Sequence, residues 1–200
     1  GKPFCVADDY PKPEALAQLQ AISPLTPVIS IDQIDPAATQ QLLLSPGVPL
    51  SLLGIQDCLS KGIEVTGDVA LFSSLVKAPV AAVTGSNGKT TTTLLTYHLL
   101  KEAGYLVGLA GNIGQSFAKQ VLENNHEYYV LEISSFQLDR CISFSPDVAI
   151  LLNITPDHLD RYEYKFENYI ASKFRIFQNA DLTKTCIFWE DDEVIQANKK

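Results

Sequence analysis

The stretch VAAVTGSNGKTT, residues 80–91, decides the fold of this chain. Residues 80–83 are apolar on every side, which is typical of a strand buried on both faces of a parallel sheet. The glycine-rich turn after them leads into a helical stretch that contains Leu94, Leu95 and Leu99 and stops at Gly104. A strand, a glycine-rich turn and a helix in this order surround phosphate oxygens with backbone N–H groups and a helix N-terminus. The sequence therefore predicts a phosphate-binding loop, which consists of Gly85, Ser86, Asn87, Gly88, Lys89, Thr90 and Thr91.

The spacing within this loop differs from the usual phosphate-binding motif. G-x-x-x-x-G-K-[ST] requires a glycine at position 83, where this chain has Val83. The motif here is the shorter Gly85-x-x-Gly88-Lys89-Thr90, in which Lys89 offers a positive charge and Thr90 a hydroxyl for Mg²⁺. The alternative interpretation is an ordinary glycine turn with a solvated lysine. The order of strand, loop and helix favours phosphate binding.

Strand-like and helix-like runs alternate on both sides of the loop. This alternation is typical of an α/β fold with a mostly parallel, doubly wound sheet. Gly67-Asp68 and the helix breaker Pro79 flank a short helical run, so we expect a domain boundary near residue 67. The predicted strands lie at 4–7, 42–44, 63–65, 80–83, 106–110, 128–133, 148–152 and 185–188, and the predicted helices at 14–21, 69–76, 116–124 and 169–177.

The composition is that of a globular protein, with 46% hydrophobic and 19% charged residues. Fifteen Lys and Arg against 23 Asp and Glu give a net charge of −8, so no overall field attracts nucleic acid or an anionic membrane. We therefore expect neither as a partner. The four cysteines form no C-x-x-C pair and follow no secretory segment, which favours a cytoplasmic protein without disulfides or zinc. No apolar run approaches the ~18 residues that span a bilayer.

Both ends of the sequence look interrupted. The chain contains no methionine and opens with Gly1-Lys2-Pro3 directly before an apolar segment. It stops at Lys200 without a closing pattern, soon after a strand-like run at 185–188. We interpret it as a piece of a longer protein.

Three polar residues follow or accompany apolar runs where a parallel sheet would place a ligand. Glu132 ends a predicted buried strand, where a metal ion would compensate its charge; the alternative is a salt bridge to Lys89. His158 follows the strand at 148–152 and is a possible metal ligand, although a lone histidine is more often structural. Lys173 lies on a predicted amphipathic helix, and its periodicity alone favours a solvated face.

Several strings of the sequence together resemble the Mur ligase superfamily of ATP-dependent amide ligases, and within it the branch that adds D-glutamate. The resemblance covers essentially the whole chain, and the string EISSFQL at residues 132–138 discriminates this branch from ligases that add other amino acids. The strings that carry it are SPG at 45–47, GIEV at 62–65, TGSNGKTT at 84–91, GNIG at 111–114, LEISSFQL at 131–138, NITPDHLDRY at 153–162 and residues 173–180.

The resemblance implies a fold, a reaction and substrates. It implies a Rossmann-like, amino-terminally incomplete domain at 1–67 that binds the UDP substrate, and a P-loop-type central ATP-binding domain at 68–200 with a mostly parallel sheet. We expect that the family's carboxyl-terminal domain is absent from this piece and lies beyond Lys200. ATP would phosphorylate the alanyl carboxylate of UDP-MurNAc-L-Ala, and the amine of D-glutamate would attack the acyl phosphate. We expect a cytoplasmic monomer, and we expect that this piece does not turn over alone.

The resemblance also implies residue roles. Lys89 would contact the β- and γ-phosphates, and Thr90 and Glu132 would hold one Mg²⁺ ion. His158 and Lys173, the latter as a carbamate, would serve a second Mg²⁺ ion. The substrate contacts implied are Asp8, Ser45, Pro46 and Gly47 for uridine and pyrophosphate, and Asn112, Ser134, Gln137 and His158 for the muramoyl and inter-phosphate region.

Three other functions remain open from the sequence. Another amide ligase of the superfamily would differ in the amino acid that it accepts. A nucleotide-binding module without turnover would have no evident need for Lys89, Glu132, His158 and Lys173 together. A simple P-loop kinase or GTPase is disfavoured by the short Gly85-x-x-Gly88 spacing and by the lack of a guanine-reading Asn-Lys-x-Asp string.

Overall fold

The structure is a computed structural model that describes residues 3–199. The chain forms two compact units, one of residues up to 43 together with 47–65, the other of residues 44–46 together with those from 66 onward. The predicted domain limits at residues 1 and 200 lie outside the described residues, and the roles predicted for the two domains stay predictions. In the described part of the chain, no helix is both long and apolar enough to cross a membrane.

The first unit begins with a small parallel βαβ arrangement. Strand β1 (Val6–Ala7) pairs with β2 (Val28–Ile29), and helix α1 (Pro13–Ile22) connects them. Proline at the first position of α1 suits a helix start, because its missing N–H would have no partner there. A 3₁₀ turn η1 (Ile31–Gln33) contacts α2 (Leu53–Ser60).

A second two-stranded sheet is formed by β3 (Gln41–Leu44) and β4 (Glu64–Gly67). The side-chain amide of Gln41 donates a hydrogen bond of 3.0 Å to the carboxylate of Glu64, so the polar ends of the two strands are also joined. The predicted strands at 42–44 and 63–65 correspond to these two, each with a slightly longer extent.

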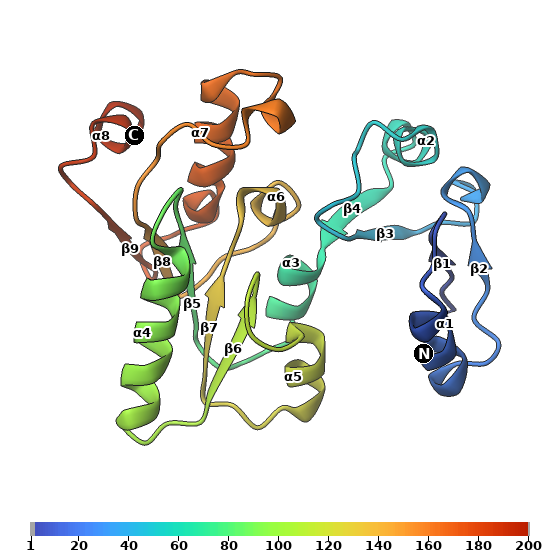
Figure 1. Ribbon diagram of the computed structural model, residues 1–200, viewed down its shortest axis with the longest axis horizontal. Helices are drawn as coiled ribbons and strands as arrows, with labels where there is room; N and C mark the ends of the chain where they lie inside the picture. The colour runs from blue at the N-terminus through green and yellow to red at the C-terminus, as the bar shows by residue number, and fades with distance from the viewer. Residues whose placement is uncertain (1–2, 200) are drawn as a thin grey trace. The chain divides into compact units, whose positions relative to one another are not determined.

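The second unit contains a five-stranded parallel sheet, which confirms the predicted α/β fold (Figure 1). The strand order is β6-β7-β5-β8-β9, so the strand before the glycine-rich loop occupies the centre. All neighbouring pairs are parallel, for example Val83 opposite Glu132 and Ile150. The strands are β5 (Val80–Thr84), β6 (Val107–Gly111), β7 (Tyr128–Glu132), β8 (Val148–Leu151) and β9 (Thr185–Phe188).

Helices cover this sheet and bury its apolar side chains (Figure 1). Helix α4 packs against β5, β6 and β7, whereas α5 packs against β6 and α3. The main core contains Val80 and Ala82 of β5 together with Leu131 of β7 and Phe117 of α5. The helices of this unit are α3 (Asp68–Ser73), α4 (Lys89–Glu102), α5 (Phe117–Glu123), α6 (Ser135–Leu138), α7 (Phe166–Phe174) and α8 (Glu193–Asn198), with 3₁₀ turns η2 (Leu159–Tyr162) and η3 (Arg175–Phe177).

A second apolar cluster fixes α7 beside the sheet. Leu151 of β8 packs there with Tyr162 of η2 and Tyr169 of α7. The hydroxyl of Ser172 donates a hydrogen bond of 3.0 Å to the carbonyl oxygen of Ser135 and so joins α7 to α6. These contacts orient the helix that carries Lys173.

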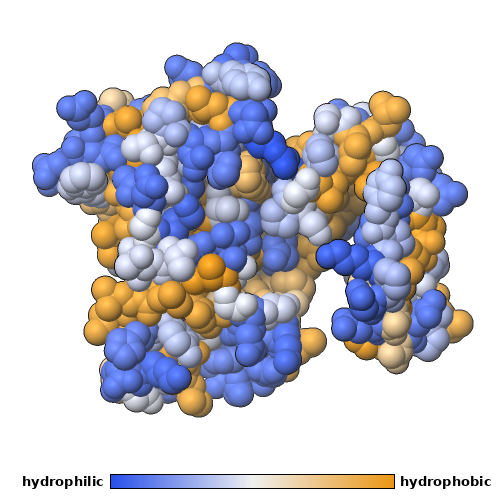
Figure 2. Space-filling model, in the orientation of Figure 1, coloured by the Kyte–Doolittle hydropathy of each residue, from blue (hydrophilic) through white to orange (hydrophobic). Residues whose placement is uncertain are grey.

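Helix α4 exposes apolar side chains. Leu94, Leu95 and Leu99 are each more than 40% exposed, while Thr93 is fully buried. Apolar surface is visible between hydrophilic regions of the molecule in Figure 2. The residues that marked this helix in the sequence are therefore not the residues that attach it to the sheet.

Candidate functional site

Most of the predicted site residues of the second unit lie in loops at one edge of its sheet. Because the strands are parallel, their carboxyl ends meet at the same edge, which is where open α/β sheets bind ligands. The glycine-rich loop follows β5, Asn112 follows β6, Glu132 ends β7, and the segment that leads to His158 follows β8. The sheet therefore gathers residues that are far apart in the sequence.

The glycine-rich loop has a backbone that requires glycine. Gly88 has a φ of +81° and forms the N-cap of α4, and Gly85 has a φ of +155°. A Cβ atom on Gly85 would lie 3.0 Å from the Cβ of Leu152 and 3.3 Å from the backbone nitrogen of Asn153, so a side chain there would be crowded as well as strained. The loop ends in the first turn of α4, whose N–H groups have no helical carbonyl to bond and are suited to an anion.

Two lysines converge on this loop. Lys89 Nζ donates hydrogen bonds of 2.9 Å to the carbonyl oxygens of Gly85 and Ser86. Lys173 Nζ donates to the same oxygen of Gly85 at 2.8 Å and to Thr84 Oγ1 at 3.2 Å. Two lysine side chains thus share one carbonyl oxygen at the centre of the sheet edge.

Lys173 is buried, with only 1% of its surface exposed, so the solvated position that its periodicity favoured is wrong. The pKa of Lys173 is lowered to about 7, chiefly by burial and then by the charge of Lys89, whereas Asp157, Asp139 and Glu132 act in the opposite direction. Desolvation disfavours an ammonium ion because water is the stronger solvent for charge. A sizeable fraction of Lys173 is therefore a neutral amine near pH 7.

Glu132 is also buried, and neutral donors hold both of its carboxylate oxygens. Thr90 Oγ1 donates to Oε2 at 2.7 Å, and Asn112 Nδ2 donates to Oε1 at 2.8 Å. The backbone N–H of Asn112 also donates to the carbonyl oxygen of Glu132 at 2.8 Å. The alternative salt bridge between Glu132 and Lys89 is not formed within residues 3–199.

The donor set of Thr90 and Glu132 fits Mg²⁺. A hydroxyl and a carboxylate supply the oxygen ligands that this ion prefers, and Mg²⁺ usually takes one or two protein ligands with the rest from water and phosphate. The described residues contain no group of three or more His, Cys, Asp or Glu side chains placed to hold a metal. A site with two protein oxygens beside a phosphate loop agrees with the few protein ligands that Mg²⁺ needs and with the absence of a larger ligand cluster among the described residues.

His158 lies apart from Lys173. Its side chain is 54% exposed, and its Nε2 lies 3.5 Å from a carboxylate oxygen of Asp157. Its ring contacts Phe136 at a centroid distance of 5.2 Å. Within the described part of the chain, no hydrogen bond or ion pair joins His158 to Lys173. The predicted second metal site of His158 and Lys173 stays a prediction.

Ser134 and Gln137 form the capping box of α6. Ser134 Oγ accepts a hydrogen bond from the backbone N–H of Gln137, whose side-chain Oε1 accepts from the backbone N–H of Ser134. Gln137 is 5% exposed. The two residues thus start a helix directly after β7, and their predicted substrate contacts stay predictions.

The remaining predicted substrate residues lie in or near the first unit. Asp8 follows β1, is exposed, and accepts a hydrogen bond of 2.9 Å from the backbone N–H of Tyr10. Ser45, Pro46 and Gly47 follow β3; Gly47 belongs to the first unit and the other two to the second. Their predicted role in binding uridine and pyrophosphate stays a prediction.

Sequence reasoning missed two residues of this edge. Asn153 bonds to the glycine-rich loop, and Tyr169 places its hydroxyl 3.1 Å from Ser86 Oγ. Lys173 Nζ lies 5.3 Å from the centroid of the Tyr169 ring. Asn153 could have been found by the signal that identified Glu132, a polar residue directly after an apolar strand. Tyr169 lies four residues before Lys173 and therefore on the same face of α7.

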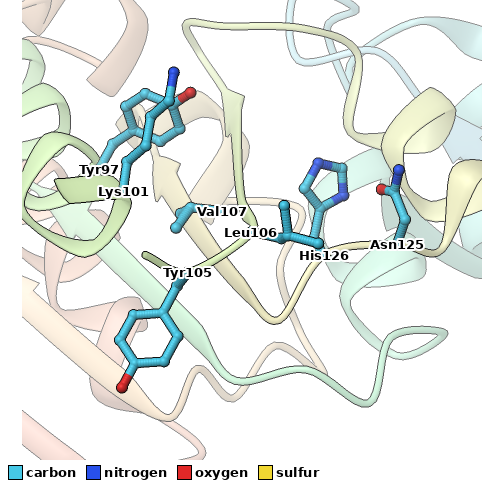
Figure 3. A pocket seen from close by; sticks show the side chains of 7 residues that line it. All are labelled: Tyr97, Lys101, Tyr105, Leu106, Val107, Asn125 and His126. Carbon is cyan, nitrogen blue, oxygen red and sulfur yellow. The ribbon is translucent and has the colours of Figure 1, made fainter. Parts of the chain in front are cut away.

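A hollow elsewhere on the second unit holds none of the predicted site residues. It has a volume of about 150 Å³ and lies near the amino end of β6, at the opposite edge of the sheet from the glycine-rich loop. Figure 3 shows Lys101 beside the Tyr97 ring and Tyr105 pointing away from both. Its lining residues are Tyr97, Lys101, Tyr105, Leu106, Val107, Asn125 and His126.

Comparisons with known proteins agree with this architecture. Residues 83–200 match the family described as the Mur ligase middle domain. A protein of Cytophaga hutchinsonii named UDP-N-acetylmuramoylalanine--D-glutamate ligase is 53% identical over 165 residues, which are 82% of this chain and 37% of that protein. A Bacteroides fragilis protein of the same name is 48% identical over 159 residues, which are 80% and 36% of the two chains. The chain thus spans little more than a third of the length of these curated relatives.

Solved structures show the same fold at lower identity. A Neisseria meningitides ligase, UDP-N-acetylmuramate:L-alanyl-gamma-D-glutamyl-meso-diaminopimelate ligase, has a TM-score of 0.58 at 17% identity over 96% of this chain and 64% of its own. The MurF ligase of Thermotoga maritima in complex with ADP has a TM-score of 0.50 at 21% identity over 82% of this chain and 47% of its own. With the family match over residues 83–200, the parallel sheet and the phosphate loop, the chain belongs to the Mur ligase family.

Proposed function

We propose that this chain is the ATP-binding part of a ligase that joins D-glutamate to UDP-N-acetylmuramoyl-L-alanine in peptidoglycan precursor synthesis. Two relatives that share about half of its residues carry the name of that enzyme. A structural neighbour of the same fold was solved with ADP. We expect these properties of the whole enzyme to need the polypeptide that the relatives have in addition to the matched part.

One observation carries the proposal. Lys89 and Thr90 of α4, Glu132 of β7 and Lys173 of α7 meet around the loop after the central strand. A phosphate loop alone would fit many nucleotide-binding proteins. The buried carboxylate and the buried second lysine supply charges that match a triphosphate with its divalent ion.

The chemistry of an amide ligase explains why these charges are gathered. A carboxylate is a poor electrophile until one of its oxygens takes the γ-phosphoryl group and becomes part of a phosphate leaving group. ATP and the alanyl carboxylate are both anionic, so positive charge must lie between them. Lys89 would exchange its two loop carbonyls for phosphate oxygens, which are stronger acceptors because they are charged.

Mg²⁺ would be held by Thr90 and Glu132, and when bound it would neutralise charge that develops on the transferred phosphoryl group. The chain's own residues prepare this position. Asn112 and Thr90 orient the two oxygens of Glu132 before any ion arrives. An oriented carboxylate loses less entropy on binding an ion than a free one does.

Lys173 would act as a carbamate. Its neutral amine can attack the carbon of CO₂, with loss of one proton, and the product is a negatively charged N-carboxylate. This change replaces a group that repels Mg²⁺ with one that attracts it. The lowered pKa of Lys173 supports this step, because only the neutral amine has the lone pair. His158 would join Lys173 at a second ion.

Two groups of residues would contact the acceptor substrate. Asn112, Ser134 and Gln137 at the carboxyl edge would line the muramoyl and inter-phosphate region. Asp8 and residues 45–47 would bind uridine and pyrophosphate. We take these roles from the matching strings of the family, and each can be tested by substitution.

A chimera tests the proposed function. The matching part of the Cytophaga hutchinsonii ligase is replaced by this chain, and phosphate release is measured with UDP-N-acetylmuramoyl-L-alanine and ATP. We expect release that depends on D-glutamate and is abolished by Lys89→Ala in the inserted part. L-alanine and diaminopimelate, offered in parallel, should give no product. A folded chimera that binds its substrates and releases no phosphate with D-glutamate would contradict the proposal.

A further inference from the structure

The segment after β8 runs along the phosphate loop and bonds to it repeatedly. The backbone N–H of Ser86 donates to the carbonyl oxygen of Asn153 at 3.0 Å. Ser86 Oγ donates to the carbonyl oxygen of Thr155 at 2.8 Å and accepts from the N–H of Thr155 at 2.9 Å. The loop is therefore attached to a neighbouring strand end rather than supported only by its own turn.

The side chain of Asn153 extends this attachment by one residue. Its Oδ1 accepts from the backbone N–H of Asn87 at 2.9 Å, and its Nδ2 donates to the carbonyl oxygen of Asn87 at 3.0 Å. A primary amide that bonds both backbone groups of one residue imitates a neighbouring strand. Asparagine and glutamine carry such a donor and acceptor side by side on one planar amide group.

These bonds divide the loop's N–H groups into two sets. Those of Ser86 and Asn87 are occupied by Asn153, through its backbone and its side chain. Those of Lys89, Thr90 and Thr91 lie in the first turn of α4, where a helix has no carbonyl to offer them. The loop thus presents its helix-start N–H groups to an anion while the rest of its backbone is held from the side.

The glycines make this side support necessary. Gly85 and Gly88 flank the held residues, and both have positive φ values of +155° and +81°. Glycine populates positive and negative φ about equally, so the free loop has many conformations. Without Asn153, the peptide groups of Asn87 could rotate, and ligand binding would have to include the ordering of the loop.

We propose that Asn153 is a positioning residue that holds the phosphate loop in its nucleotide-binding conformation. This inference rests on the proposed function, because it takes the loop to bind a nucleotide. Asn153 acts through the backbone of Asn87, and it is not assigned a contact with the nucleotide. Its removal should weaken phosphate binding and leave the fold of the sheet intact.

The test compares Asn153→Ala with Asn179→Ala in the same chain. Asn179 is a matched control, because its Nδ2 also donates to loop carbonyls, those of Ile142 at 2.7 Å and Phe144 at 2.9 Å, away from the phosphate loop. Isothermal titration measures affinity for ADP and for inorganic pyrophosphate. We expect Asn153→Ala to bind both about tenfold more weakly, equivalent to about 1.4 kcal/mol, and Asn179→Ala to bind both as the parent does.

Amide hydrogen exchange provides a readout that needs no ligand. Asn153→Ala should accelerate exchange at Ser86 and Asn87 and leave the amides of β5 unchanged. A general loss of stability would instead accelerate all of these amides together and would leave the affinity of the folded protein unchanged. Equal ADP affinity of Asn153→Ala and the parent would overturn the positioning role while the proposed function stands. Failure of the parent chain itself to bind ADP and pyrophosphate would contradict the proposed function, and the inference with it.

Discussion

Replacing Lys173 with methionine should remove a pH dependence of stability that this buried amine creates. In the folded chain its pKa falls from 10.5 to about 7, chiefly because the side chain is buried. In the unfolded chain the same amine keeps an ordinary pKa. Between the two values the unfolded chain binds one proton more than the folded chain does, so the stability of the parent rises with pH in this window. The loss of stability caused by burying the charged amine is fully present below about pH 7 and disappears as the pH approaches 10.5.

The size of the effect follows from linkage. Each pH unit within the window changes the free energy of unfolding by about 1.4 kcal/mol per proton. Between about pH 7 and about pH 9, the free energy of unfolding changes by about 2 kcal/mol in total. The change is smaller than two full steps because the Lys173 amine of the folded chain is already half titrated at about pH 7. Methionine has a similar length and no proton to lose. The stability of Lys173→Met relative to the parent should therefore fall by about 2 kcal/mol over this interval.

Urea denaturation of both proteins at the two pH values measures this difference. The buffer is free of carbonate, so that the amine stays unmodified. Methionine also removes the hydrogen bonds to Thr84 and Gly85, but that loss is the same at both pH values and cancels in the comparison. All other titratable side chains are the same in both proteins. A stability difference that is equal at both pH values would refute the argument that burial holds this lysine near neutrality.

Three further substitutions test the site. Lys89→Ala should weaken ADP binding roughly 10- to 100-fold, as expected for the loss of hydrogen bonds to a charged group worth about 1.5–3 kcal/mol; Lys101→Ala, at the far end of α4, is the control in the same titration. Glu132→Ala should raise the Mg²⁺ concentration at which ADP binding is half maximal, and an unchanged Mg²⁺ dependence would exclude its metal role. Gly111→Ala should destabilise the chain by about 1–3 kcal/mol in urea, since its φ is +95° and a Cβ would collide with the carbonyl oxygen of Glu132. A Cβ atom at Gly47 would have no neighbour within 4 Å, so Gly47→Ala should leave the free energy of unfolding unchanged.

The order of strands and helices in the second unit was predictable because apolar runs and glycine turns are local signals. Glu132 was found by the same logic, since a carboxylate at the end of a buried strand needs a partner. The position of Lys173 could not be derived from periodicity. Its burial depends on the packing of α7 against α6 and on the carbonyl of Gly85, which are tertiary contacts between segments far apart in the sequence. Only the family resemblance singled it out.

The limits of several helices differ from those that the sequence predicted. The helix predicted at 69–76 ends at Ser73, where Ser73 Oγ and Ser74 Oγ donate to carbonyl oxygens of the preceding turn. Serine side chains compete with the backbone in this way and favour helix ends. The helix predicted at 169–177 begins earlier, at Phe166, and tightens to a 3₁₀ turn at Arg175. Helix α6 was not expected, because its four residues are too short for a periodic pattern.

The carbonyl oxygen of Gly85 accepts hydrogen bonds from two lysines that lie on different helices. It is the common acceptor for the side-chain nitrogens of Lys89 and Lys173, and the charge of Lys89 lowers the pKa of Lys173. If a triphosphate draws Lys89 away, as the proposed function requires, Lys173 would lose a repelling neighbour and gain sole use of that oxygen. Nucleotide binding at the loop would then change the protonation of Lys173, a residue on another helix.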